Sequence, residues 1–162
     1  METSNGFREE YFFLSNFEKS PMTATIRGTE AVFPTGEHLF QAYKLECSNI
    51  SDIAAVAMVK QFANAPTPSK AKYAGRSVPL DISAWNDASY EYMRKTLQAK
   101  FGQNPKLAKK LRDTEGLTLV EYNSWNDRLW GKDEKTREGK NQLGILLMEL
   151  RSTLVAFDAQ LF

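Results

Sequence analysis

The sequence predicts an α+β fold, mostly helical, with a small antiparallel sheet. Two observations support this class. Apolar residues recur at helical spacing through much of the second half of the chain, with Gly and Pro residues at the expected helix ends. β-Branched residues flank a possible hairpin turn near the N-terminus. The 162 residues, 42% hydrophobic and 25% charged, are typical of an ordinary globular protein, and we expect a single domain over residues 1–162.

The first third of the chain is expected to contain the sheet and one helix. Residues 11–17, YFFLSNF, are predicted to be extended, and residues 23–33, TATIRGTEAVF, are predicted to form a hairpin that turns at Arg27-Gly28. Within the segment PTGEHLFQAYK, a helix is predicted to follow Pro34, with the apolar residues Leu39, Phe40 and Tyr43 on one side and Glu37, Gln41 and Lys44 on another.

The remaining elements follow from periodicity and from helix-ending residues. Residues 52–63 are predicted to form a helix, and a proline-rich connector then leads into a short helix that Gly75 ends. The apolar series Tyr90, Met93, Leu97 and Phe101 predicts a long helix, with Asp87 as its cap and Gly102 as its end.

After this long helix, Pro105 is expected to begin a short basic helix, and residues 117–122, LTLVEY, are predicted to form a strand. A helix is expected from about Asn141, with a leucine-rich seam. Between the strand and this helix lies a stretch without regular structure, residues 123–141, and loops of this length in a compact domain usually indicate function or disorder.

Composition argues against several classes of protein. The net charge of +1 provides no overall field that would attract nucleic acid, so such a contact would need a local patch. The one cysteine, Cys47, excludes an intramolecular disulfide and fits a reducing compartment. The N-terminus has no apolar signal region and no stretch approaches the ~18 apolar residues of a membrane span, so we expect a cytoplasmic protein with no membrane contact.

Metal binding is not expected. His38 and Cys47 are nine positions apart on one predicted helix, so they would leave it on opposite sides, about 13 Å apart along its axis. His38 is expected to be a structural or surface residue. The segment EGKNQLG fails as a phosphate loop because Lys140 is followed by Asn. Gly139, Lys140 and Asn141 nevertheless precede a helix, so they are either an anion site or a simple N-cap.

Polar residues line one face of the helix after Pro34. Glu37, Gln41 and Lys44 stand at i, i+4 and i+7. If Thr35 caps this helix, a capping box would require Glu or Gln at position 38, so Glu37 is not the partner of the cap. The stripe is therefore either a solvated face, with Glu37 favoured by the helix dipole, or one wall of a substrate site. Asp127, in the long loop between two tryptophans, is a second candidate carboxylate.

Five sequence blocks together resemble the NADAR (YbiA-like) family. They are FLSNF, PTGEHLFQAYK, Trp85 with Met93-Arg94 and LQAKF, LVEYNSWNDRLWG, and GKNQLGILLMELR. The resemblance runs from about Tyr11 to Arg151 and implies a small α+β fold with N-glycosidase activity. Two departures concern Gly36, where many relatives have Ser, and the loop after Gly131, which is often glycine-rich in relatives and reads KDEKTRE here.

The resemblance implies two substrate classes. Some members cleave the N-glycosidic bond of early riboflavin-pathway intermediates, and others remove ADP-ribose from guanine bases in DNA. We favour the second, so the expected partner is an ADP-ribosylated nucleic acid, with a phosphoribosyl-amine small molecule as the alternative. A non-catalytic module that binds NAD or ADP-ribose is the alternative of another class. No cofactor is expected, and the sequence does not predict an oligomeric state.

The resemblance also implies roles for individual residues. The catalytic positions fall on Glu37, Lys44 and Asp127. Lys44 would attack an opened glycosylamine as a neutral amine, or the two carboxylates would activate water directly. The expected substrate-binding residues share an aromatic, amide or glycine-loop character, and they are Asn16, Phe17, Trp85, Trp130, Gly139, Lys140 and Asn141.

Overall fold

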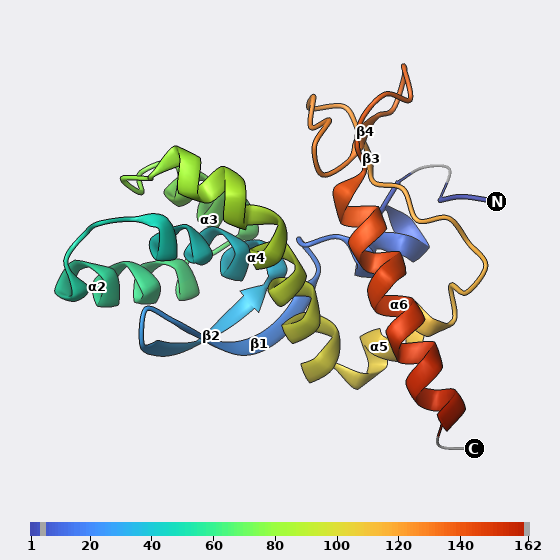
Figure 1. Cartoon of the computed structure of the whole chain (residues 1–162), viewed down its shortest axis with the longest axis horizontal. Coiled ribbons are helices and arrows are strands. Elements are labelled where there is room, and N and C mark those ends of the chain that lie inside the picture. Colours follow the sequence, from blue (N-terminus) through green and yellow to red (C-terminus); the bar gives the residue numbers. More distant parts are fainter. Residues whose placement is uncertain (4–5, 161–162) are drawn as a thin grey trace. The chain divides into compact units, whose positions relative to one another are not determined.

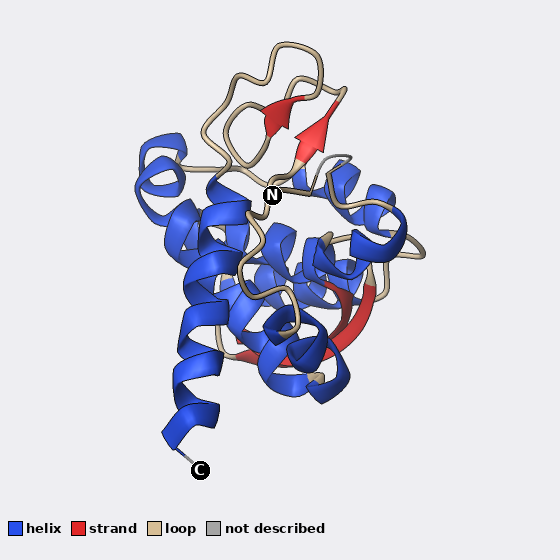
Figure 2. Ribbon diagram, turned by 90° about the vertical axis from the view of Figure 1, so that its right-hand side faces the viewer, coloured by secondary structure: helices blue, strands red, loops and turns tan. Residues whose placement is uncertain are grey.

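The computed structural model describes residues 1–3 and 6–160, and most of them are helical (Figures 1 and 2). The one sheet of appreciable length in this part of the chain is a two-stranded antiparallel hairpin, so the predicted α+β class is confirmed. The chain divides into two compact units, one formed by residues 16–104 and the other by residues 1–15 together with 105–162.

The hairpin consists of β1 (Lys19–Ile26) and β2 (Thr29–Thr35). The predicted turn is confirmed: Arg27 and Gly28 both have positive φ, 48° and 80°, as a type I′ turn requires. Arg27 accepts this conformation although it is not a glycine. Its guanidinium donates to the carbonyl of Ile50 at 2.9 Å and to Asp52 at 2.8 Å, which ties the turn to the start of the helix α2 (Asp52–Ala63).

Five helical elements complete the unit of residues 16–104. They are α1 (Gly36–Ala42), the 3₁₀ helix η2 (Tyr43–Cys47), α2 (Asp52–Ala63), α3 (Pro68–Gly75) and α4 (Ile82–Gln103). The helices predicted after Pro34, over 52–63, before Gly75 and around Met93 are therefore confirmed. The first one changes type at Tyr43, where its last turn tightens into η2.

The predicted cap of the long helix is wrong. Asp81, not Asp87, is the N-cap of α4, and its carboxylate accepts from the Ala84 N–H at 3.0 Å. Asp87 lies inside the helix on its exposed side. Gly102 does not end α4 either, since the helix continues to Gln103. The helix begins earlier than its apolar series indicated, and the series misses the first turn because that turn buries little surface.

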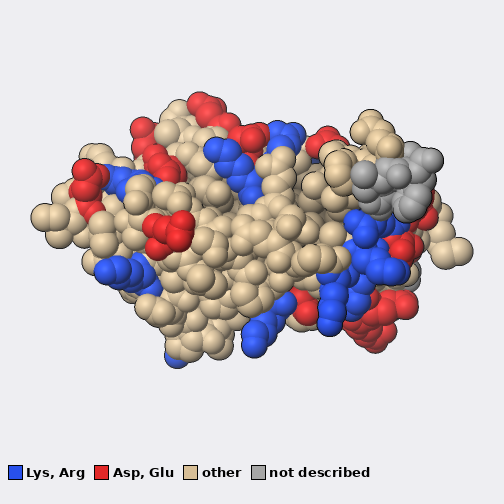
Figure 3. Space-filling model, turned by 90° about the horizontal axis from the view of Figure 1, so that it is seen from below, with Lys and Arg blue, Asp and Glu red and all other residues tan. Residues whose placement is uncertain are grey.

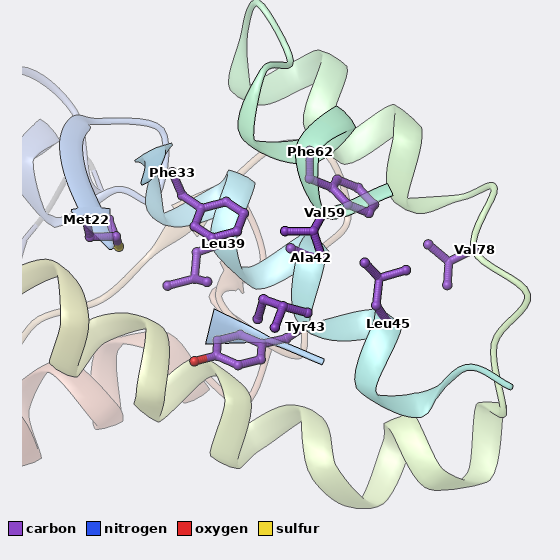
Figure 4. Close-up of a cluster of buried hydrophobic side chains, with 10 residues drawn as sticks. Met22, Phe33, Leu39, Ala42, Tyr43, Leu45, Val59, Phe62 and Val78 are labelled. Carbon is purple, nitrogen blue, oxygen red and sulfur yellow. The ribbon is translucent and has the colours of Figure 1, made fainter. Parts of the chain in front are cut away.

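The core of this unit lies between the hairpin and its helices. Phe33 of β2, Leu39 and Ala42 of α1, and Phe62 of α2 are almost completely buried (Figure 4). The other members of the cluster share the same apolar character and burial, and they are Met22, Ile26, Tyr43, Leu45, Val59 and Val78. α1 packs against α2, α3, α4 and β2, so all its residues are buried.

The second unit contains the 3₁₀ helix η1 (Glu9–Leu14), α5 (Pro105–Arg112), α6 (Gln142–Gln160) and the parallel pair β3 (Tyr122–Asn123) and β4 (Lys132–Asp133). The predicted helices from Pro105 and from about Asn141 are confirmed. The extended conformation predicted for residues 11–17 is wrong over its first half. Phe13 and Leu14 are adjacent and both buried, whereas a strand would place them on opposite faces.

The strand predicted over residues 117–122 is also largely wrong, since only Tyr122 belongs to a strand and Thr118 forms an isolated bridge with Glu2. Side chains supply the hydrogen bonds that a partner strand would give. The Thr3 hydroxyl donates to the Val120 carbonyl and accepts from its N–H, both at 2.8 Å. Asn141 accepts from the Glu121 N–H and donates to the Leu119 carbonyl.

The surface carries both signs of charge. Lys and Arg side chains and Asp and Glu side chains both appear on the face shown in Figure 3. This mixture agrees with the net charge of +1. No helix in the described part of the chain combines the length and the apolar character needed to cross a bilayer.

Candidate active site

Asn16 and Gly36 determine how α1 begins. Thr35 caps the helix by accepting from the His38 N–H, and the Glu37 N–H donates to the Asn16 carbonyl at 2.9 Å. A Cβ on Gly36 would lie 2.7 Å from Asn16 Oδ1, so this position needs the small residue. The Asn16 amide donates to the sulfur of Met93 on α4 at 3.2 Å. The chain before β1 therefore fixes the first turn of α1.

The Glu37 carboxylate is buried in this first turn and is joined to Gln41. Glu37 is 8% exposed and Gln41 is 5% exposed. The amide of Gln41 donates from Nε2 to Glu37 Oε1 at 2.8 Å, one helical turn away. The hypothesis that this stripe is the solvated face of the helix is therefore wrong. Burial of an acid without a core-packing function is typical of a functional carboxylate.

Lys44 lies on the same stripe and meets α3 and α4. Its amine donates to the Gly75 carbonyl at 3.5 Å and lies 6.0 Å from the centroid of the Trp85 ring. Burial lowers the pKa of Lys44 below its ordinary value. The Glu37 carboxylate opposes this shift, and the positive charges of Arg76 and Lys72 add to it. A lowered pKa increases the share of neutral amine, which is the nucleophilic form.

Trp85 of α4, the ring beside the amine, belongs to a cluster of packed aromatic rings. Trp85 is stacked on Tyr92, with 6.0 Å between ring centroids and 14° between planes, and it packs against Phe40 at 5.3 Å. Tyr92 in turn stacks on Tyr43 at 4.7 Å. Trp85 is half-buried, so part of its ring is available for a base or sugar.

His38 is a structural residue, as expected. Its Nδ1 lies 2.7 Å from the Thr35 hydroxyl and its Nε2 lies 3.0 Å from the Ala65 carbonyl. Because a carbonyl only accepts, Nε2 carries the proton and Nδ1 accepts from Thr35. Burial lowers the pKa of His38, which keeps the ring neutral in this arrangement.

Asp127 and Trp130 belong to the other unit, in the loop between β3 and β4. Asp127 Oδ1 accepts from the N–H groups of Leu129 and Trp130, at 3.1 and 2.9 Å. Its own N–H and carbonyl are held by the Asn123 side chain. The carboxylate thus fixes the turn that presents Trp130, a capping function that was not evident in the sequence. Asp133 organises the next turn in the same way.

Residues 139–141 are tightly built into this unit. Gly139 has a φ of 145°, and a Cβ there would lie 2.4 Å from the Gly131 carbonyl. The N–H groups of residues 140–143 donate to the carbonyls of Arg128, Gly131, Leu129 and Trp130. The Asn141 side chain is buried and bonded to residues 119 and 121. Any anion held here would depend on side chains such as the exposed Lys140.

The structure thus places the predicted residues in two sets. Asn16, Phe17, Glu37, Lys44 and Trp85 lie in the unit of residues 16–104, where Phe17 is half-buried. Asp127, Trp130 and Gly139 to Asn141 lie in the other unit. No group of three or more His, Cys, Asp or Glu residues suited to a metal is found within the described residues.

Three residues in the unit of residues 16–104 were not assigned a functional role from the sequence. Gln41 donates a hydrogen bond to the Glu37 carboxylate. Gly75, expected only to end a helix, lies against both Gln41 and Lys44. Lys100 is fully buried in α4, and burial lowers its pKa to about 7, opposed by Glu18. Its position seven residues after Met93, on the apolar face, was the signal in the sequence.

The family of the chain follows from comparison with known proteins. The model of the NADAR domain matches residues 4–155. The chain belongs to the NADAR family. This result confirms the family indicated by the sequence blocks.

Relatives and a solved structure agree with membership in the NADAR family. The N-glycosidase YbiA of Escherichia coli is 37% identical over 148 residues, which cover 90% of this chain and 83% of the relative. A maize chloroplast protein named riboflavin biosynthesis protein PYRR is 32% identical over 133 residues, 79% of this chain and 21% of the relative. The NMR structure of E. coli YbiA matches with a TM-score of 0.74 at 32% identity and covers 98% of this NADAR chain and 89% of the other.

Proposed function

We propose that this NADAR protein is an N-glycosidase that hydrolyses the bond between ribose C1 and an exocyclic nitrogen. The main observation is the arrangement on α1 and η2, where a half-buried lysine amine of lowered pKa lies close to a buried glutamate. The relative named N-glycosidase YbiA, which aligns over 90% of the chain, supports the same reaction type.

Lys44 is proposed as the nucleophile. A glycosylamine opens when its ring oxygen takes a proton, which leaves an imine between C1 and the exocyclic nitrogen. The neutral Lys44 amine adds to C1, and the exocyclic nitrogen leaves as an amine after it receives a proton. Water then adds to the lysine imine and releases the sugar aldehyde, so one water is consumed and Lys44 is regenerated.

Glu37 is proposed to carry the protons in these steps. A carboxyl group that alternates between acid and base can protonate the ring oxygen and the leaving nitrogen, and then deprotonate water. The hydrogen bond from Gln41 fixes one oxygen of the Glu37 carboxylate. Asp127, in the other unit, is proposed as a further catalytic residue, and its carboxylate holds the loop of Trp130. A direct route, in which the carboxylates activate water, needs no lysine nucleophile.

Aromatic stacking and positive charge support a substrate with a base and a phosphate. The ring of Trp85 is proposed to stack on the base or sugar, with Asn16 and Phe17 at the border of the site. Lys72 and Arg76 act electrostatically on Lys44, so they lie close enough to attract a phosphate group. Trp130 and residues 139–141 remain proposed substrate contacts in the other unit.

Two substrate classes fit these features. ADP-ribosylated guanine in DNA is the first candidate, because its diphosphate and base would use the cations and the rings together. Early riboflavin-pathway intermediates are the second, and the name of the maize relative specifically favours them. Both contain a ribose C1 joined to an exocyclic nitrogen.

A direct comparison of substrates tests the proposal. The protein is incubated with ADP-ribosylated DNA and with the riboflavin-pathway intermediates, and release of the sugar is followed by chromatography. Release from the DNA substrate supports the first candidate, and release only from the small molecules supports the second. If neither is hydrolysed while calorimetry shows tight binding of ADP-ribose, the protein is a binding module and the proposed activity is wrong.

A further inference from the structure

The Gln41 amide is paired at one end and not at the other. Nε2 donates to Glu37 Oε1 at 2.8 Å, whereas Oε1 is buried and has no hydrogen-bond partner within the described residues. A buried amide oxygen without a partner costs about 1–3 kcal/mol, so such groups are rare in folded proteins. The side chain is 5% exposed, so bulk water does not satisfy this oxygen.

The unpaired oxygen and the Lys44 amine lie beside each other against Gly75. The position that a Cβ on Gly75 would occupy is 1.9 Å from Gln41 Oε1 and 3.2 Å from Lys44 Nζ. The Gly75 carbonyl also accepts from this amine at 3.5 Å. The amide of Gln41 therefore lies between the carboxylate of Glu37 and the neighbourhood of the amine, with one polar end toward each.

The charges that act on the amine come from several elements. Glu37 from α1 favours the ammonium form, and Lys72 and Arg76, at the C-terminal part of α3, disfavour it. α4 contributes the uncharged ring of Trp85. Glu37 is thus the one group among them that favours the ammonium form, and Gln41 is bonded directly to it.

We propose that Gln41 is a positioning residue that couples the protonation of Glu37 to that of Lys44 by reversing its amide. When Glu37 is ionised, Nε2 donates to it and Oε1 faces the ammonium of Lys44. When Glu37 is protonated, its O–H donates to Oε1, and Nε2 now faces the lone pair of a neutral amine. An amide presents two donors at one end and acceptors at the other, so a half-turn exchanges the two patterns.

The coupling conserves protons and serves the proposed reaction. One proton moves from the Lys44 ammonium to the Glu37 carboxylate, which leaves a neutral amine and a carboxylic acid. These are the forms needed when the lysine adds to C1 and the acid protonates the leaving nitrogen. The purpose of the device rests on the proposed function, but its existence does not, because the contacts of Gln41 with Glu37 and beside Lys44 are present without substrate.

A titration of Lys44 in four proteins tests the coupling. Proton–carbon NMR of the lysine ε-methylene follows Lys44, assigned by the loss of its signal in Lys44→Arg, in the wild type, Glu37→Gln, Gln41→Met and the double variant. Methionine keeps the length of the side chain and removes both polar ends. We expect Glu37→Gln to lower the Lys44 pKa in the protein that has Gln41. In the protein with Met at position 41, the same substitution should lower the Lys44 pKa by about half a pH unit less.

Equal shifts in the two backgrounds would overturn the proposal, because the carboxylate would then act on the amine only through space. If Gln41→Met does not fold, Gly75→Ala replaces it, since the added Cβ displaces Oε1 and leaves Gln41 itself in place. Substrate turnover is measured on the same wild-type sample. If the Lys44 pKa shift is equal in both backgrounds and turnover is normal, the amide coupling is wrong and the proposed function stands. If the shift is smaller with Met at position 41 and neither substrate class is turned over, the coupling stands and the proposed function is wrong.

Discussion

Gly75 is the position where a single methyl group should separate activity from stability. It is the last residue of α3, and the Cβ of an alanine there would lie 1.9 Å from Gln41 Oε1. Ordinary contact begins near 3.4 Å, so the amide oxygen must move by roughly 1.5 Å. That movement disturbs the hydrogen bond from Gln41 to Glu37 and crowds Lys44, whose amine is 3.2 Å from the same point.

The two effects of Gly75→Ala have different sizes. Alanine in a helix is favoured over glycine by about 0.5–1 kcal/mol, which offsets part of the cost of moving a flexible side chain. We therefore expect the free energy of unfolding to change by less than about 1 kcal/mol. A displacement of about 1 Å in a catalytic group can cost 10²-fold in rate, so we expect kcat/KM to fall by about 10- to 100-fold.

Gly102→Ala is the matched control. Gly102 also lies within a helix, α4, and a Cβ there would have nothing within 4 Å. Gly102→Ala should raise the free energy of unfolding by about 0.5–1 kcal/mol, the helix preference of alanine over glycine, and should leave kcat/KM unchanged. Urea denaturation and initial rates are measured on both variants. A folded Gly75→Ala protein with the rate of Gly102→Ala would refute the inferred arrangement of Gln41 and Lys44.

Three further substitutions test separate parts of the structure. Glu37→Gln should lower kcat by about 10²–10⁴-fold and change stability by no more than about 1 kcal/mol, because the amide can still accept from Gln41; near-normal rates would exclude Glu37 as the proton carrier. Trp85→Ala should raise KM by about tenfold or more with a smaller change in kcat, and an unchanged KM would remove the stacking role. Lys100→Met should raise the free energy of unfolding, as measured by denaturation across pH.

The pH dependence of Lys100→Met follows from linkage. The pKa of Lys100 is lowered from 10.5 to about 7 in the folded protein, so between these values the unfolded chain binds more protons and stability of the natural protein rises with pH. Below about pH 7 the cost of burying the ammonium is fully present. The gain from methionine should thus be largest there and shrink as pH rises toward 10.5. A gain in the free energy of unfolding that does not depend on pH would mean that the protonation of Lys100 does not affect the stability of the fold.

Local sequence patterns predicted the elements whose determinants are themselves local. The Arg27-Gly28 turn and the helix over residues 52–63 depend on neighbouring residues and were predicted correctly. Residues 119–121 were predicted as a strand because their composition suits one. Their hydrogen bonds come from Thr3 and Asn141, more than 15 positions away, which local patterns cannot show.

The candidate site shows the same division. The i, i+4 spacing correctly brought Glu37 and Gln41 together, and the family resemblance indicated Lys44. Whether that stripe faced water or protein was decided by the packing of α3 and α4 around α1, which periodicity alone left open. Gly75 looked like a helix end in the sequence, and only the tertiary contact gives it a role beside the amine.

Borohydride trapping during turnover tests the central claim most directly, since the claim is that Lys44 forms a covalent imine with the opened sugar. Borohydride added to the protein with the substrate that it hydrolyses should reduce the imine to a stable secondary amine, and peptide mass spectrometry should place the sugar adduct on Lys44. Lys44→Arg keeps the positive charge but is too basic to become a neutral nucleophile, so it should yield no adduct and no turnover. An active Lys44→Arg protein, or an adduct on a different lysine, would contradict the account.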